Sequence, residues 1–469
     1  MRKRDKGIIL AILILFPIII GMGVLLLIQM DQYQKHTPVS ANGSLAVEGQ
    51  RIVNEDGYNF DLKGISTMNI GWQPEYVNRD AFLTARDKWG VNTIRLPIPT
   101  SGSHGYCRKE NREVILETLE LGIDLAEELG MYVIVDWHTL NEKDPNIYRE
   151  YAIEVLDYIS QKYQDARHII YEICNEPNGS RVRWKKIKAY AEQVIPVIRE
   201  HDPNAIIIVG TPDFCTNLEG PIKDPIIGVD NLMYSYHFYA GSSMIRRREE
   251  FQSWAETGLP ILVSEFSVSE TDSDGTDAPA FVSANHWMKL LDDYGIGKVY
   301  FSLSAEEQTN AMLRADCDKR GSWSREDLSE SGCWVVDYYK DYTGRYKDTL
   351  GVTELSTSAS EVDGVTADLA LESYGSEELG YSSFYKIKIK NDSKNDVENW
   401  RLKIVFDDII EMKDSWNGSY LIEQNQLEIT PAEWNHKVEM GEEIEIGFIV
   451  TGRDLSCVLE MQLQIESGN

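Results

Sequence analysis

Apolar and polar positions alternate in a regular succession from about residue 60 to residue 350. Short runs rich in β-branched and aromatic residues are separated by longer stretches in which apolar positions recur with a helical period. The stretches 111–130 and 184–202 are typical of amphipathic helices. We predict strands at residues 59–66, 91–98, 131–138, 168–175, 205–210, 232–239, 260–267 and 297–304.

This succession of strands and helices predicts a (β/α)8 barrel, an α/β fold known as the TIM barrel. The strands are almost continuously apolar, which agrees with a parallel sheet covered by helices. A doubly wound open sheet is the alternative. No glycine-rich phosphate loop opens a helix after the first strand, which argues against the nucleotide-binding versions of that sheet.

The pattern changes near residue 350. Residues 351–364 are small, polar and without period, which is typical of a linker. Alternation with period two then predicts a small all-β sandwich. Its strands are expected at residues 384–391, 399–406, 426–430, 442–450 and 457–465. We therefore predict a barrel domain at 45–349, a linker at 350–362 and a β-sandwich at 363–469.

The first thirty residues are a separate segment. Gly7 to Ile28 contains no charged residue, and the basic sequence MRKRDK precedes it. About 20 apolar residues span a bilayer core, and a basic flank stays in the cytoplasm. We expect a transmembrane anchor at 1–30, an extracellular stalk at 31–44 and a single-pass protein of the cell membrane. A cleaved signal peptide, which would give a secreted protein, is the alternative, but its apolar region is typically only about 7–15 residues.

Net charge and cysteine content narrow the choice of partners. The formal charge of −30 disfavours binding to nucleic acid and to anionic lipid headgroups. The six cysteines form no CxxC motif and no Cys/His cluster, so no metal site is predicted. A disulfide is permitted outside the cell. A Cys317–Cys333 bridge and six free thiols are equally compatible with the sequence.

Polar residues gather at the carboxyl ends of the predicted strands, where the active site of such a barrel lies. The second strand ends near Arg95 and the seventh at Glu265. The third, fourth and sixth end in Asp136-Trp137-His138, Asn175-Glu176 and His237-Phe238-Tyr239. We expect these residues to line one site.

Glu176 and Glu265 come from well-separated strands, and glycoside hydrolysis needs such a pair of carboxyl groups. One donates a proton to the leaving oxygen, and the other attacks the sugar carbon or activates water. Other chemistries have less support. No GxSxG motif indicates an acyl-transfer serine, and His138 and His237 lack the HExxH spacing of a zinc site. No metal or organic cofactor is expected.

The segment from Asn59 to Gly344 resembles glycoside hydrolase family 5, in particular its bacterial endoglucanase branch. The motifs GVNTIRLP, YVIVDWHTLN, IIYEICNEPNG, YSYHFYAG and PILVSEFS occur in order. The resemblance implies a retaining double displacement on β-linked glycans, with Glu176 as acid/base and Glu265 as nucleophile. It also implies that Asn175 bonds the sugar 2-hydroxyl, that Arg95 and Tyr239 orient the nucleophile, and that His138 and His237 line the cleft.

Several cleft positions depart from the family pattern. Phe266-Ser267 stands where Trp-Gly usually follows the nucleophile, and Met68 stands where this branch commonly has a His. On the eighth strand, Phe301 replaces a stacking Trp and offers a smaller ring. The stretch Ala305-Glu306-Glu307 lacks a Lys that often bonds sugar hydroxyls in this branch. Trp72 still fits a sugar platform, so these departures leave the substrate open.

The C-terminal unit resembles carbohydrate-binding module family 2 through VENWRLKIVF, SWNG, EWN and MGEEIEIGF. Exposed aromatic side chains of that family stack on glucan chains. The resemblance implies this role for Trp416 and Trp434, with Tyr374 or Tyr381 as a third ring. Trp416 and Trp434 stand beside Asn or Gly, which places both in turns and not within the alternating strands. Trp400 matches a core position. A purely structural sandwich with Trp416 in its core is the alternative.

The sequence thus predicts a membrane-anchored, extracellular, retaining endo-β-1,4-glucanase with a glycan-binding sandwich. Its partners are a polysaccharide, the β-glucan substrate, and the membrane. Another β-glycanase, such as a mannanase or xyloglucanase, is the alternative among enzymes. A catalytically weak surface protein that only binds glycan is the alternative of another class. Chain-length preference, processing of the anchor and oligomeric state stay open.

Overall fold

The computed structural model describes residues 37–241, 244–269, 279–340, 357–377, 380–406, 410–423, 425–452 and 458–465. They fall into two compact units. The first unit contains the described residues up to 279 and residues 290–340. The second unit contains residues 280–289 and the described residues after 340. The predicted anchor at 1–30 lies outside the described residues. Among those that are described, no helix combines the length and the apolar character that a membrane span requires.

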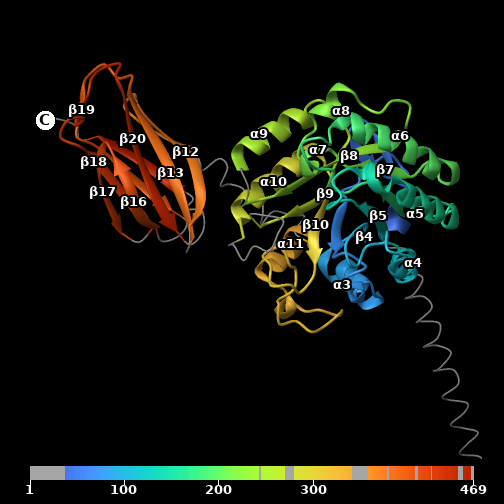
Figure 1. Cartoon of the computed structure of the whole chain (residues 1–469). Helices are drawn as coiled ribbons and strands as arrows, with labels where there is room; N and C mark the ends of the chain where they lie inside the picture. The colour runs from blue at the N-terminus through green and yellow to red at the C-terminus, as the bar shows by residue number, and fades with distance from the viewer. Residues whose placement is uncertain are drawn as a thin grey trace, which may run out of the picture. The chain divides into compact units, whose positions relative to one another are not determined.

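The first unit is a closed barrel of eight parallel strands in the order β10-β3-β4-β5-β6-β7-β8-β9 (Figure 1). All eight predicted strands are present, so the barrel is confirmed and the open sheet is excluded. The strands are β3 (Lys63–Thr67), β4 (Thr93–Pro99), β5 (Tyr132–His138), β6 (Ile169–Glu172), β7 (Ile206–Val209), β8 (Leu232–Tyr239), β9 (Ile261–Ser267) and β10 (Lys298–Leu303).

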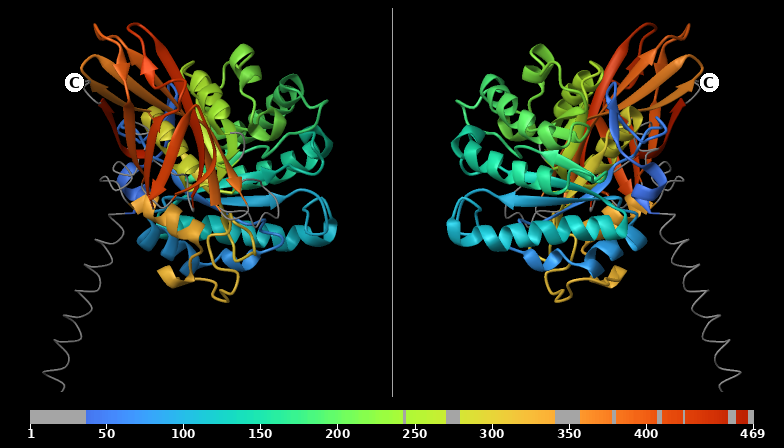
Figure 2. Two further views of the ribbon diagram at one scale, coloured as in Figure 1. Left: turned by 90° about the vertical axis from the view of Figure 1, so that its left-hand side faces the viewer. Right: turned by 90° about the vertical axis from the view of Figure 1, so that its right-hand side faces the viewer.

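Helices follow the strands along the chain, and Figures 1 and 2 show α3 to α6 outside the strands. Helix α3 shows how local sequence sets their ends. The Asn78 side chain caps its first turn by accepting a hydrogen bond from the Ala81 amide at 2.9 Å, and Gly90 ends it with a φ of 74°. The α-helices of the barrel segment are α3 (Arg79–Trp89), α4 (Arg112–Leu129), α5 (Arg149–Lys162), α6 (Trp184–His201), α7 (Pro212–Cys215), α8 (Glu219–Lys223), α9 (Met244–Ala255), α10 (Phe281–Tyr294) and α11 (Glu330–Lys340).

The amino-terminal end of the barrel is closed by residues that the sequence assigned to a stalk. Helix α2 (Pro38–Asn42) and the hairpin of β1 (Ala46–Glu48) and β2 (Arg51–Val53) precede the first barrel strand. The Val39 amide donates to the Gly130 carbonyl at 2.9 Å, and the Tyr132 hydroxyl donates to the Gly43 carbonyl at 2.7 Å. The predicted stalk boundary at residue 44 is therefore wrong. Residues 37–44 fold onto the barrel because these hydrogen bonds and the apolar side chain of Val39 tie them to it.

Inward-facing positions of the barrel change character from one end to the other. Tyr132 and Ile134 of β5, with Ile170 of β6, belong to an apolar cluster towards the amino-terminal end. Two residues further along the same strands, Asp136 and Glu172 are fully buried. Because side chains alternate across a strand, residues two apart face the same way. The barrel interior thus becomes polar towards the carboxyl ends of the strands.

The cysteines of this unit form no disulfide. Cys107, Cys174, Cys215, Cys317 and Cys333 are free thiols, which rules out the 317–333 bridge that the sequence permitted. Cys174 is fully buried, as expected for a packing residue, and so is Cys215.

The second unit contains a β-sandwich whose two main sheets enclose one apolar core. The five-stranded sheet has the order β11-β12-β13-β20-β16, and the four-stranded sheet has the order β17-β18-β15-β21. These strands are β11 (Thr357–Val362), β12 (Val365–Glu377), β13 (Gly380–Asn391), β15 (Trp400–Phe406), β16 (Ile410–Trp416), β17 (Gly418–Glu423), β18 (Gln426–Pro431), β20 (Glu443–Gly452) and β21 (Val458–Ile465), and β14 (Val397–Glu398) pairs with β19 (Lys437–Val438).

Strand β11 lies inside the predicted linker, so the linker boundaries at 350–362 are wrong. Its sequence, TSASEV, has almost no apolar alternation. As an edge strand, it is held mainly by its antiparallel backbone pairing with β12. The Ser360 hydroxyl also accepts a hydrogen bond from the Leu463 amide of the other sheet at 2.9 Å. An edge strand held this way leaves little hydrophobic signal in the sequence.

Candidate active site

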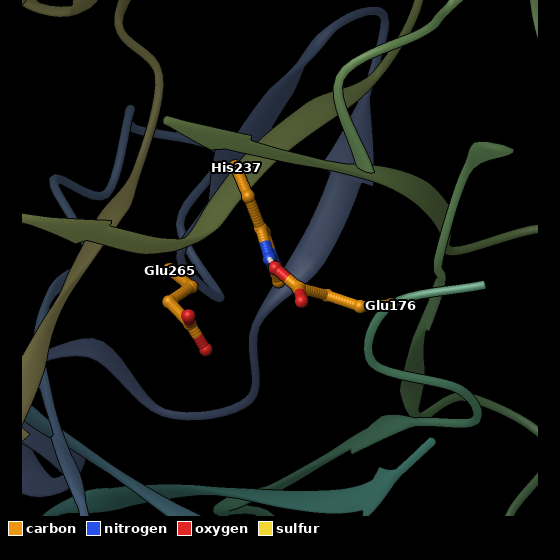
Figure 3. A group of neighbouring side chains, drawn as sticks. All are labelled: Glu176, His237 and Glu265. Carbon is orange, nitrogen blue, oxygen red and sulfur yellow. Dashed lines mark hydrogen bonds and ion pairs between the residues drawn. The ribbon is translucent and has the colours of Figure 1, made fainter. Parts of the chain in front are cut away.

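Two carboxyl groups share the polar mouth of the barrel. Glu265 lies on β9, and Glu176 lies in the loop after β6. Each residue is only 4% exposed. One carboxyl oxygen from each, together with a ring nitrogen of His237, lie within 4.8 Å of one another. Figure 3 shows Glu176 and Glu265 entering one space from different parts of the chain, with His237 against Glu176.

The loop that carries Glu176 is fixed by its neighbours and not by strand pairing. Strand β6 ends at Glu172, earlier than the predicted end at residue 175. Beyond it, the Asn175 amide donates to the Trp137 carbonyl at 3.1 Å, and the Glu176 amide donates to the Thr139 carbonyl at 2.9 Å. These contacts hold the backbone of Glu176 against the loop that follows β5.

The other side of this loop packs against the segment after β7. The Cys215 thiol donates to the Asn175 carbonyl at 2.8 Å. Gly210 is required here, because an added Cβ would lie 2.1 Å from the Cys174 carbonyl oxygen. The Asn178 side chain donates to the Glu176 carbonyl at 2.9 Å. The carboxyl group of Glu176 is therefore presented by a loop fixed on two sides.

Arg95 lies beneath the two carboxyl groups and not at a strand end as predicted. It occupies the third position of the seven-residue strand β4 and is fully buried. Its Nη1 donates to Glu265 Oε2 at 3.1 Å, and its Nε donates to Glu172 Oε2 at 2.8 Å. Its Nη2 lies 3.0 Å from Asp136 Oδ2 and donates to Asn175 Oδ1 at 2.6 Å. Burial disfavours the cation, but the charges of Asp136, Glu172 and Glu265 outweigh it and raise the pKa of Arg95.

Glu265 is held at both of its carboxyl oxygens. Arg95 donates to Oε2, and the Tyr239 hydroxyl donates to Oε1 at 2.6 Å. Two fixed donors restrict the rotation of the carboxylate, so its position does not depend on a bound ligand. The structure brings together Arg95, Tyr239 and Glu265 as the sequence predicted.

Glu172 belongs to the hydrogen-bond network of the candidate site, and the sequence did not predict it. It links Arg95 to the residues around Glu176, because Ser264 Oγ donates to Glu172 Oε1 at 2.6 Å. Ser264 Oγ also lies 3.0 Å from His237 Nε2, and His237 Nδ1 lies 2.7 Å from Glu176 Oε1. A carboxylate in an otherwise apolar strand, within IIYEIC, was the signal that could have found it.

The proton positions along this chain follow from Glu172. Burial opposes the charge of Glu172, but the charge of Arg95 and the nearby His237 lower its pKa to about 2. As a carboxylate, Glu172 only accepts, so Ser264 donates its single proton to it. His237 Nε2 must then donate to Ser264. The remaining nitrogen, Nδ1, faces Glu176 and shares one proton with it.

His237 carries an unusually basic imidazole. Burial lowers its pKa, but the neighbouring carboxylates of Glu172, Glu176 and Glu265 raise it to about 9. His237 Nε2 lies 3.0 Å from Ser264 Oγ and 3.9 Å from Glu172 Oε1, so its hydrogen bond is with Ser264. His237 thus connects the buried charge of Glu172 to the carboxyl group of Glu176.

His138 is placed at the same mouth by Asp136. Its Nδ1 lies 2.7 Å from Asp136 Oδ2, and its side chain is 13% exposed. Burial lowers the pKa of His138, but the charge and hydrogen bond of Asp136 raise it above its usual range. The structure therefore brings His138 and His237 to one mouth, each held by an acidic partner.

Asn175 is almost fully buried, at 1% exposure, beside Glu176. Its Oδ1 accepts from Arg95, which directs the amide nitrogen Nδ2 away from the guanidinium. Nδ2 donates to the Thr139 carbonyl at 3.3 Å, a long contact. The amide is thus fixed by Arg95 and retains donor capacity.

Of the positions that depart from the family pattern, Phe301, Ala305 and Glu306 are partly exposed and Glu307 is exposed, whereas Met68 and Phe266 are buried. Trp72 is 46% exposed. Phe266 is fully buried and stacks on Phe238, with ring centroids 5.6 Å apart. Met68 is 9% exposed. Phe266 therefore belongs to the packing behind β9, and this substitution does not change the surface of the mouth.

Glu176, His237 and Glu265 are the one group among the described residues with ligand-type atoms close enough to hold a metal ion. Both nitrogens of His237 already face protein oxygens, Glu176 Oε1 and Ser264 Oγ. Their separations of 2.7 and 3.0 Å are those of hydrogen bonds. The hydrogen-bond network thus accounts for the position of each group.

The sandwich presents the two predicted tryptophans differently. Trp434, in the turn between β18 and β19, is 68% exposed. Trp416 is half-buried and is the last residue of β16, so its predicted place in a turn is wrong. It covers Gly447, whose added Cβ would lie 2.2 Å from the indole, and its ring centroid lies 5.2 Å from that of Phe384. Trp400 is 1% exposed, as expected for a core residue.

The residues that follow the two tryptophans are joined by a hydrogen bond. The Asn435 side chain, next to Trp434, donates to the carbonyl of Asn417, next to Trp416, at 2.6 Å. Asn435 is itself 2% exposed, so this link is part of the fold. The side chains of Tyr374 and Tyr381, the predicted third ring, lie outside the described residues.

A (β/α)8 barrel with two fixed carboxyl groups at the carboxyl ends of its strands defines the class of the glycoside hydrolases. The model of the family described as "Cellulase (glycosyl hydrolase family 5)" matches residues 53–307, and the chain belongs to this family. A second model, described as "Cellulose binding domain", matches residues 376–461. Both predicted resemblances are confirmed.

Named relatives agree with this assignment. Endoglucanase A of Butyrivibrio fibrisolvens is 42% identical over 298 residues, which are 63% of this chain and 68% of that protein. Endoglucanase A of Evansella cellulosilytica is 38% identical over 286 residues, 60% of this chain and 56% of that protein. The catalytic domain of Thermobifida fusca endoglucanase Cel5A is a structural neighbour with a TM-score of 0.61 and 32% identity, covering 65% of this chain and 100% of that one.

Proposed function

We propose that this protein is a retaining endo-β-1,4-glucanase in which Glu265 is the nucleophile and Glu176 the general acid and base. The proposal rests on the spacing of the two carboxyl groups. One carboxyl oxygen of Glu176 and one of Glu265 lie within 4.8 Å of each other. A retaining enzyme needs carboxyl groups only about 5–5.5 Å apart, and an inverting enzyme needs roughly 6.5–9.5 Å to admit water. The endoglucanase relatives support β-1,4-glucan as the substrate.

In the first step, a Glu265 oxygen attacks the anomeric carbon and forms a glycosyl ester. The bond from that carbon to the leaving oxygen breaks, and Glu176 gives its proton to the leaving oxygen. Arg95 and Tyr239 hold the attacking carboxylate in one orientation. Asn175, fixed by Arg95, offers its amide N–H to the sugar 2-hydroxyl, where such bonds strengthen in the transition state.

In the second step, Glu176 takes a proton from water, which attacks the anomeric carbon and releases Glu265. Glu176 must therefore accept and return one proton in each cycle. The proton shared by His237 Nδ1 and Glu176 Oε1 lies where this exchange takes place. His237 is a positioning residue that keeps the acidic proton at the mouth.

A polysaccharide panel tests the reaction and its stereochemistry together. Residues 37–469 are expected to release reducing ends from β-1,4-glucan faster than from mannan, xylan or xyloglucan. Proton NMR of the first-formed product should show the β-anomer, because two inversions restore the configuration. An initial α-anomer would rule out the covalent mechanism. If reducing ends are released fastest from another glycan, the mechanism stands and that glycan is the substrate. If none of the glycans releases reducing ends, the protein only binds glycan.

We also propose that the sandwich binds cellulose through Trp434 and Trp416. Stacking on a flat ring contributes on the order of 1–3 kcal/mol by analogy with bases on aromatic platforms. Because Trp434 is 68% exposed, Trp434→Ala should weaken binding of residues 357–469 to insoluble cellulose several-fold and leave unfolding unchanged. Trp416→Ala should weaken binding and also lower the thermal midpoint, since this ring packs on Gly447 and Phe384.

Leu421→Ala is the matched control for these two variants, because Leu421 is 58% exposed on the same domain. Pull-down with cellulose and thermal unfolding are the two measurements. The tryptophans have no specific role in cellulose binding if Leu421→Ala weakens binding as much as Trp434→Ala does. The same conclusion follows if the isolated sandwich stays in the supernatant.

For location, we propose a single-pass protein of the cell membrane with the barrel and sandwich outside. The uncharged run from Gly7 to Ile28 and the basic residues before it support this placement. The protein should fractionate with membranes and be cut by protease added to intact cells. Mass spectrometry of the mature amino terminus is the deciding measurement. A chain that begins near Asn42 would mean a secreted enzyme.

A further inference from the structure

Gln73 and Glu306 form a polar pair at the barrel mouth that the proposed mechanism does not use. Gln73 follows β3 and is 8% exposed, and Glu306 follows β10 and is half-buried. The Gln73 amide nitrogen donates a short hydrogen bond to Glu306 Oε1. The Gln73 carbonyl oxygen, Oε1, is buried and has no hydrogen-bond partner among the described residues. A buried acceptor without a donor costs free energy unless a ligand supplies one.

The pair lies on the same face as the catalytic carboxyl groups. Strands β3 and β10 are parallel neighbours, and β10 also pairs with β9, which carries Glu265. In the eight-strand order, β10 is opposite β6, after which Glu176 follows. The loops after β3 and β10 thus flank Glu265 on the side away from Glu176.

Backbone contacts fix both loops. The Ile70 amide donates to the Pro97 carbonyl of β4 at 3.0 Å, and the Gln73 amide donates to the Asn69 carbonyl at 2.9 Å. The loop after β10 is held to that strand, because the Ser302 amide of β10 donates to the Asn310 carbonyl of the loop at 3.1 Å. Trp72, which precedes Gln73 in the chain, is 46% exposed and offers an apolar ring on the same loop.

We propose that Gln73 and Glu306 form a sugar subsite that selects uncharged glucosyl units and rejects units that carry a carboxylate. The proposal rests on the proposed function. The free Oε1 of Gln73 and the carboxylate of Glu306 both accept, so their ligand must donate, and a sugar hydroxyl does so. Because Glu176 protonates the leaving group on its own side, this subsite holds the part of the glycan that is transferred to Glu265.

The same residues disfavour an acidic sugar for an electrostatic reason. No cation among the described residues forms an ion pair with Glu306. Arg320, whose guanidinium carbon lies 5.2 Å from the Tyr76 ring centroid, has its guanidinium 3.7 Å from Glu75. A uronate or carboxymethyl group in this subsite would meet Glu306 at short range without compensation. The discrimination should weaken as salt screens the two charges.

The test compares Glu306→Gln with Glu307→Gln, a matched change at the exposed neighbouring residue. The substrates are carboxymethylcellulose and hydroxyethylcellulose of equal substitution, at ~0.01 M and ~1 M salt. For Glu306→Gln at low salt, the ratio of kcat/KM on the anionic to the neutral polymer should rise on the order of tenfold. At high salt the rise should largely disappear, and Glu307→Gln should behave as the unchanged protein.

Gln73→Leu tests hydroxyl recognition with a residue of similar volume. It should raise KM for hydroxyethylcellulose several-fold and leave kcat unchanged, because an interaction present in both ground and transition states is removed. An unchanged anionic-to-neutral ratio in Glu306→Gln, or an equal change in Glu307→Gln, would overturn the inference while the glucanase activity stands.

A protein without activity on any β-glucan would instead contradict the proposed function. The subsite is then decided by calorimetric titration of Glu176→Gln with cellotetraose and with its C6-oxidised glucuronate form. Weaker binding of the acidic form, relieved by adding Glu306→Gln, supports the subsite. Equal binding of both forms refutes it.

Discussion

Glu265→Gln should reduce hydrolysis of unactivated β-glucan by more than the ~10²–10⁴-fold that a positioned acid contributes. Glutamine keeps the shape and one acceptor oxygen, so the Tyr239 hydroxyl retains a partner. It cannot form the glycosyl ester, because an amide is a far poorer nucleophile than a carboxylate. Steady-state release of reducing ends is the measurement.

Thermal unfolding of the same variant controls for a structural effect. The change removes one charge beside Arg95, which keeps Glu172 and Asp136 as ion-pair partners. The midpoint should therefore change little. Azide added to a Glu265→Gly variant should restore turnover and give an α-glycosyl azide, since a small anion attacks once from the side of the missing carboxylate. Near-native turnover of Glu265→Gln without azide would show that another group is the nucleophile.

Glu176→Gln should lower kcat/KM on unactivated glucan by ~10²–10⁴-fold, because the leaving oxygen departs without a proton. A dinitrophenyl glycoside of cellobiose needs no proton on its leaving group, so its first step should proceed at a rate close to that of the unchanged protein. Single-turnover release of dinitrophenol measures this step. Equal losses on the activated and unactivated substrates would contradict a role as general acid.

Azide separates the roles of the two residues. With Glu176→Ala and the activated substrate, azide should intercept the glycosyl ester and give a β-glycosyl azide, because it attacks in place of water. Glu265→Gly should give the α-configured product. The same configuration from both variants would show that the two assignments are not distinct.

The prediction for Glu176→Gln depends on His237, which connects Glu176 to the buried charge of Glu172. The His237 pKa of about 9 keeps a proton on the link between Glu172 and Glu176 through the neutral range. Glu172 itself never reaches the substrate in this arrangement, because it lies one layer below the mouth and is fully buried. In the proposed mechanism Glu172 acts only through Arg95 and Ser264, to which it is hydrogen-bonded, so it is a positioning residue.

The sequence by itself determined the barrel, its eight strands and most of the candidate site. Period and composition locate strands well when both faces of a strand are buried, and carboxyl groups at strand ends mark the active face of a barrel. The motifs around Asn175, Glu176 and Glu265 were specific enough to indicate the family. Trp400 and Trp434 were also assigned correctly to the core and to the surface of the sandwich.

The sequence did not predict the elements that are held mainly by backbone hydrogen bonds. Strand β11 carries small polar residues and pairs along an edge, and residues 37–44 are fixed by hydrogen bonds to Gly130 and Tyr132. Hydrophobic periodicity indicates only which side chains are buried. For this reason β11 was predicted to be part of a linker and residues 37–44 part of a stalk. Trp416 was placed in a turn because Asn417 and Gly418 follow it, but β16 extends to this residue.

Only the tertiary structure decided how the charges are connected. Arg95 of β4 and Glu172 of β6 are 77 positions apart and are separated by β5 in the sheet. They meet because a closed barrel turns alternate side chains of every strand into one interior. The same closure brings Gln73 to Glu306 across 233 positions and leaves one acceptor of Gln73 unused. Which residues are partners depends on register and barrel closure, and these are set by packing across the whole domain rather than by any local pattern.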